Sequence, residues 1–155
     1  MKEAQMVDAA IAYAAEIGFA YEYGDLRPYG REAICHIPSQ TIYMQPGLLA
    51  CKERSLAWHE IAHAVLGHEP TMFEHLNRRQ ELAADEWASH MLIDHGEYAL
   101  AEEKFGANTE WIAQELCVLE KIVVAYERTL LRIGDEVIVN ARLGRGQWTQ
   151  KLEAV

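Results

Sequence analysis

Residues 55–68, SLAWHEIAHAVLGH, carry three histidines and one glutamate in a stretch whose apolar residues recur with a helical period. A helix would place His59 and His63 on one face, because residues four apart point the same way and lie about 6 Å apart along the axis. Two imidazoles in this arrangement can bind one metal ion. Glu60 would lie beside the ion, where it can accept a proton from metal-bound water. The spacing H-E-x-x-H therefore indicates metal-assisted hydrolysis.

A catalytic zinc ion needs a third protein ligand and an open position, and the next predicted helix offers two acids. Glu81 and Asp85 stand four apart in RQELAADEWASHMLID. We expect Glu81 to be the third ligand. We expect Asp85 to accept the N–H of a liganding histidine and so fix its tautomer. The alternative is that both acids form ion pairs with Arg78 or Arg79 on a solvated surface.

Among the histidines outside the motif, we exclude His68 as a ligand, and the rival ligands are His75, His90 and His95. His68 follows His63 by five residues and is therefore rotated off the ligand face. His90 follows Glu81 by nine residues, on the opposite side of that helix, and the directions of the other two are open. His75, His90, His95 or Tyr43 remains a candidate to stabilise the oxyanion. Cys35 and His36 form a further pair, but we interpret them as strand residues.

Apolar periodicity and chain breakers predict an α+β fold, mostly helical with a small β-sheet beside the H-E-x-x-H helix. We expect one domain over residues 1–155, with a catalytic core at 1–95, C-terminal helices at 97–131 and a strand-and-turn tail at 132–155. The predicted helices are 3–17, 51–66, 79–94, 97–105 and 109–131, the last broken near Cys117. The predicted strands are FAYEY, EAICHI and TIYMQ, with a hairpin near Pro38.

Small and apolar residues predict how the two metal-site helices pack. Ala84 and Ala88 are small enough to let the second helix approach the first closely. The residues expected on the buried side of the first helix are Ile61, Ala64, Val65 and Leu66.

Composition indicates the cellular compartment of the protein and excludes some classes of partner. The three cysteines, Cys35, Cys51 and Cys117, are odd in number and widely spaced, which argues against a disulfide framework and favours a reducing cytosol. No apolar run approaches the roughly 20 residues of a membrane span, and the N-terminus lacks a clean signal block.

The net charge of −10 argues against nucleic-acid binding. Residues 109–130 resemble a helix-turn-helix, but we interpret them as a helical pair that packs on the core or docks a partner.

LAWHEIAHAVLGH followed by RQELAADEWASHMLI is similar to the zinc metallopeptidases of the ImmA/IrrE family, whose second helix reads E-x-x-A-[DN]-x-[FW]-A-x-x-L-[LI]. The resemblance implies a compact zincin fold in which His59, His63 and Glu81 bind one Zn²⁺ ion and Glu60 is the general base. Two departures are Ala83, where the family often has an acid, and MLID, where it often has LLMP.

The resemblance also implies a cytoplasmic endopeptidase that cleaves a specific protein, such as a helix-turn-helix transcriptional repressor of a phage, mobile element or stress response. The alternative is a non-cleaving, zinc-binding antirepressor or toxin–antitoxin component that acts by binding alone. In either case the partner is a protein, and neither nucleic acid nor membrane binding is expected. In zincins an edge strand at the position of TIYMQ can pair with an extended peptide, and the alternative is that TIYMQ is an ordinary core strand.

Overall fold

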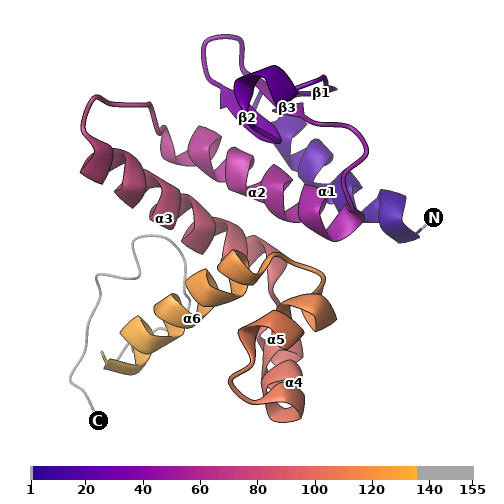
Figure 1. The fold of residues 1–155 in the computed structure, drawn as a ribbon, viewed down its shortest axis with the longest axis vertical. Helices are drawn as coiled ribbons and strands as arrows, with labels where there is room; N and C mark the ends of the chain where they lie inside the picture. The colour runs from indigo at the N-terminus through magenta and orange to yellow at the C-terminus, as the bar shows by residue number, and fades with distance from the viewer. Residues whose placement is uncertain (1, 136–155) are drawn as a thin grey trace.

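The computed structural model describes residues 2–135 and has the predicted α+β fold (Figure 1). The N-terminal part contains α1 (Lys2–Glu16), β1 (Ala20–Tyr23), the 3-10 helix η1 (Arg27–Tyr29), β2 (Ala33–His36) and β3 (Thr41–Met44). The remaining helices are α2 (Ala50–Leu66), α3 (Glu74–Leu92), α4 (His95–Phe105), α5 (Thr109–Leu116) and α6 (Glu120–Asp135). Within the described part of the chain, no helix is both long and apolar enough to cross a bilayer.

The three strands form one sheet in the order β1-β3-β2. β1 pairs parallel to β3, whereas β2 pairs antiparallel to β3 across a turn at residues 37–40, as the predicted hairpin requires. The interpretation of TIYMQ as an edge strand is wrong, because β3 lies in the centre of the sheet. The edge strand on the side of the metal-site helix is β2, which contacts α2.

Helix α2 lies between the N-terminal layer and α3, with α1 and the sheet on one side of it (Figure 1). The close contact between α2 and α3 follows from small residues, since Ala57, Ala84 and Ala88 are fully buried. The predicted burial is correct for Ile61, which is 0 % exposed, but wrong for Val65 and Leu66 at 41 % and 37 %. These two residues form the last turn of α2, which extends beyond the core.

The segment resembling a helix-turn-helix forms α5 and α6 and packs against the rest of the molecule as predicted. The break falls at Cys117, which adopts a left-handed conformation with φ 56° and closes α5. α6 lies against α3 (Figure 1). Ile122, Val123 and Tyr126 of α6 are buried in the common core.

Three further features differ from the sequence-based expectations. α3 begins at Glu74 rather than near residue 79, so the preceding loop is shorter. Residues 132–135 belong to α6, and the rest of the predicted tail strand and turn lies outside the described residues. The argument against disulfides is also wrong, since Cys51 and Cys117 are bonded to each other with their Cα atoms 4.8 Å apart. The sequence separation of 66 concealed the pair, which lies where Arg54 and Ser55 of α2 hydrogen-bond the backbone at the end of α5 and in the turn after it.

Candidate metal centre

His59, His63 and Glu81 form a group of side chains that can hold a metal ion. The two histidine Nε2 atoms are 3.0 Å apart. Glu81 places Oε2 3.1 Å from Nε2 of His59 and Oε1 3.1 Å from Nε2 of His63. The helical i, i+4 spacing brings the imidazoles together, and the contact of α3 with α2 adds the carboxylate.

The donor atoms have the chemistry and separations that zinc requires. Two ligands bound at 2.0–2.1 Å with tetrahedral angles lie about 3.3 Å apart, close to the separations seen here. His59 is 4 % exposed and His63 13 %, whereas Glu81 is 54 % exposed. The three donors therefore leave one side of the site open to solvent, which is the arrangement of a catalytic rather than a structural zinc site.

Asp85 orients His59 from behind the metal group. The Nδ1 atom of His59 donates a hydrogen bond to Oδ1 of Asp85 at 2.7 Å, which confirms the predicted contact and leaves Nε2 free to face the other donors. Neither Glu81 nor Asp85 pairs with Arg78 or Arg79; Arg78 contacts Glu74 instead. The surface ion-pair alternative for these two acids is therefore wrong.

The carboxylates make this site attractive to cations. Burial by itself would lower the pKa of His59, but hydrogen bonds to Asp85 and Glu81 outweigh it and raise that pKa to about 9. Hydrogen bonds from His59 and His63 to the Glu81 carboxylate hold the pKa of Glu81 well below its usual range. A metal cation would neutralise the same two carboxylates that favour a proton here, so proton and metal compete for the site.

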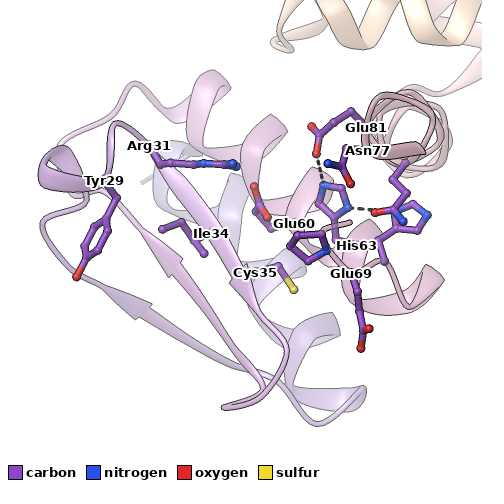
Figure 2. Close-up of a pocket in the computed structure, with 12 residues that line it drawn as sticks. Tyr29, Arg31, Ile34, Cys35, Glu60, His63, Glu69, Asn77 and Glu81 are labelled. Atoms are coloured by element: carbon purple, nitrogen blue, oxygen red, sulfur yellow. Dashed lines mark hydrogen bonds and ion pairs between the residues drawn. The ribbon is translucent and has the colours of Figure 1, made fainter. Parts of the chain in front are cut away.

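Glu60 lies beside the group without joining it. Its side chain is 7 % exposed, and burial raises the pKa of its carboxyl against the opposing effect of the two imidazoles. It lines an open cleft of about 580 Å³ together with His63 and Glu81 (Figure 2). A carboxylate with a raised pKa at this position can take up a proton and release it again.

His68 belongs to the surroundings of the site, although the sequence placed it off the ligand face. The Nδ1 atoms of His63 and His68 lie 3.0 Å apart. If Nε2 of His63 faces a metal, its Nδ1 carries the proton and donates a hydrogen bond to Nδ1 of His68. Burial, followed by the charge of His63, lowers the pKa of His68, which favours the neutral acceptor. Gly67, in the left-handed conformation, turns the chain so that His68 folds back onto α2.

Lys121 is a further residue near the site that sequence reasoning did not identify. Its Nζ lies 3.5 Å from Oδ1 of Asp85, the oxygen that also accepts the bond from His59. Lys121 comes from α6, and no sequence spacing relates it to α3. The contact exists because α6 packs across α3.

The remaining candidates lie elsewhere. His95 bonds the Tyr126 hydroxyl, and the ring of His90 packs on Tyr126. Neither these histidines nor His75 and Tyr43 line the cleft. Cys35 does line it, but burial and the charge of Glu60 raise the pKa of its thiol to about 12, so the thiol stays protonated.

Comparison with known proteins gives one match. The family model of peptidase M78, described as the IrrE N-terminal-like domain, matches residues 13–126. This span begins in α1 and ends in α6, so it includes the sheet, the metal group and the cleft. Neither the curated proteins nor the solved structures gave a match.

Proposed function

The chain belongs to the peptidase M78 family of IrrE N-terminal-like domains, and on that premise we propose that it is a zinc-dependent endopeptidase acting on one protein partner. The observation that carries the proposal is the convergence of His59, His63 and Glu81 beside an open cleft. These three residues would bind the zinc ion, since two imidazoles and a carboxylate are the donor set that suits zinc best.

The chain's own residues supply the proton transfers of peptide hydrolysis. Zinc bound at this site would lower the pKa of a water molecule and polarise the scissile carbonyl. Glu60 would accept the proton of the attacking water and then deliver it to the leaving amine. Its buried position supports both steps, because the raised pKa lets the carboxyl hold the proton between them. Asp85 and His68 would hold the two imidazoles in orientation.

An extended peptide would enter the cleft along β2, the edge strand beside α2. Ile34 and Cys35 of this strand line the cleft, and an edge strand offers unpaired backbone groups to a substrate. The resemblance to ImmA/IrrE proteins favours a helix-turn-helix repressor as that substrate, in the cytoplasm. The location rests on the resemblance alone, because the Cys51–Cys117 bond removes the argument from cysteine content.

A Glu60→Gln variant tests the proposal against binding without cleavage. We expect the variant to retain its zinc, measured by mass spectrometry, because the ligands are unchanged. Cleavage of the repressor, followed by the appearance of new N-termini, should fall by at least about a hundredfold with loss of the general base. If the variant relieves repression as well as the wild type, the protein acts as an antirepressor or toxin–antitoxin component and not as a peptidase.

A further inference from the structure

Two side chains of opposite charge line the cleft on either side of Glu60. Arg31 lies just before β2, and Figure 2 shows its side chain extending toward Glu60. Glu69 comes from the loop between α2 and α3 and lies on the other side of Glu60 (Figure 2). The metal group is therefore flanked by a cation near the sheet and an anion near the α2–α3 loop.

Neither charge has a partner among the residues that the structure describes. Over residues 2–135, Arg31 and Glu69 make no ion pair and no side-chain hydrogen bond, and both are exposed. Four other surface cations do have partners, in the pairs Arg27–Asp25, Lys52–Glu32, Arg78–Glu74 and Lys104–Glu115. No ion pair or side-chain hydrogen bond within residues 2–135 therefore explains the position of Arg31 in the cleft of a chain with net charge −10.

The chemistry of the two groups indicates what they can recognise. A guanidinium stays charged at every physiological pH and forms paired hydrogen bonds with a carboxylate. Glu69 would attract an ammonium or guanidinium in the same way. A peptide lying in the cleft would shield these pairs from water, so each would discriminate more strongly than a surface ion pair.

We propose that the cleft selects a peptide by charge order, with an acidic side chain facing Arg31 and a basic side chain facing Glu69 across the scissile bond. This proposal rests on the proposed peptidase function and specifies its substrate class. Arg31 and Glu69 act as specificity residues and Glu60 as the base between them. The rival role for Arg31 is stabilisation of the oxyanion, which would affect every peptide equally.

Two sets of internally quenched peptides test the proposal on the zinc-loaded protein. One set carries Glu before and Lys after a randomised central pair, and the other carries Lys before and Glu after it. A third set with Gln at both positions gives the uncharged reference. We expect the wild type to prefer one charge order by about tenfold in kcat/KM over the reverse order. Equal cleavage of both orders overturns the proposal.

Charge variants show whether Arg31 and Glu69 cause the preference. Arg31→Glu combined with Glu69→Arg should reverse the favoured order, whereas Arg31→Gln should remove most of the difference in kcat/KM between the two charge orders. Arg79→Gln is the matched control, because Arg79 is exposed and makes no ion pair within residues 2–135, as is true of Arg31, but lies outside the cleft. An unreversed order in the double variant, or an equal slowing of all three sets by Arg31→Gln, overturns the proposal.

A binding measurement separates this proposal from the peptidase function. Zinc-loaded Glu60→Gln protein is titrated with the fluorescent peptides, and binding is followed by anisotropy. If the wild type cleaves no peptide but the variant binds one charge order about tenfold more tightly, the peptidase function fails and the charge selection stands. Equal binding of both orders, or no binding of either up to about 1 mM, overturns the charge selection.

Discussion

Asp85 connects the metal group to the C-terminal helices, since one of its oxygens contacts both His59 and Lys121. Removing its charge should loosen the imidazole and weaken the negative field that attracts the metal. We predict that Asp85→Asn lowers zinc affinity by about 10- to 100-fold, as other residues that orient metal ligands do. Competition with a fluorescent chelator measures the change. Asp8→Asn, on the exposed face of α1, is the control of equal charge change, and an unaltered affinity in Asp85→Asn would contradict the role given to Asp85.

Tyr23 gives the protein a pH dependence in the alkaline range. Its hydroxyl donates to the buried Glu53 at 2.7 Å, alongside that of Tyr21 at 3.0 Å. Burial and this hydrogen bond raise the pKa of Tyr23 to about 12, above the value of about 10 in an unfolded chain. The folded state therefore holds this proton more tightly. The resulting stability is fully present below about pH 10 and is lost as the pH rises toward 12.

Replacing the hydroxyl should remove that dependence. We predict that the free energy of unfolding of Tyr23→Phe falls less steeply between pH 10 and 12 than that of the wild type. Urea unfolding at several pH values measures the slope. Tyr29→Phe serves as the control, because Tyr29 is 72 % exposed and makes no side-chain hydrogen bond within the described residues. Parallel curves for Tyr23→Phe and the wild type would show that Tyr23 makes no such contribution.

The contact between α2 and α3 decides whether Glu81 reaches the histidines. Ala84 is fully buried one turn away from Glu81 in α3, the helix that packs against α2. A larger side chain there must push the helices apart, which costs about 1–3 kcal/mol in a packed core. We predict that Ala84→Leu destabilises the protein by this amount and also weakens zinc binding, because the carboxylate moves away from the imidazoles. Ala99→Leu on the exposed face of α4 should change neither property.

The outcome of that experiment also tests whether the helices act as rigid supports. If Ala84→Leu is destabilised but binds zinc as the wild type does, Glu81 can follow the imidazoles by side-chain rotation alone. The unfolding free energy and the zinc affinity must therefore be measured on the same samples.

The local elements and the metal group follow from the sequence because they depend on short spacings. Helical periodicity predicts α2 to within one residue at its start, and the i, i+4 spacing predicts that His59 and His63 converge. Small residues predict the close approach of α3. The early start of α3 was missed because EHLNR has no apolar period, and the loop before it is fixed by Asn77, which bonds Thr71.

Other parts of the site depend on contacts that no local pattern encodes. Lys121 reaches Asp85 only because α6 crosses α3, and the order of the strands places β2 rather than β3 at the edge. His68 returns to His63 through the left-handed turn at Gly67, whereas extension of the helix would have rotated it away. The sequence-based expectation that His68 points away from the ligand face assumes a continuous helix, but α2 ends at Leu66, before Gly67 and His68.

At the scale of the whole molecule, the Cys51–Cys117 bond joins the first turn of α2 to the end of α5. Arg54 reinforces the same junction by donating to the carbonyl oxygens of Leu92, Leu116 and Cys117. The loop closed by the disulfide contains both metal-site helices. Its length determines how strongly the crosslink restricts the unfolded chain.

Chain entropy gives the size of that effect. A loop between residues separated by 66 positions corresponds to about 4 kcal/mol in the loop-closure treatment. We predict that Cys51→Ser with Cys117→Ser, or reduction of the wild type, lowers the unfolding free energy by this amount and Tm by about 10 °C. Cys35→Ser is the control, since Cys35 is the free cysteine, and reductant should not affect the double variant. Thiol titration must show two newly freed cysteines in the reduced wild type; if they appear while Tm stays constant, the bond does not stabilise the fold. The α2–α5 junction would then depend on Arg54 and the apolar core alone.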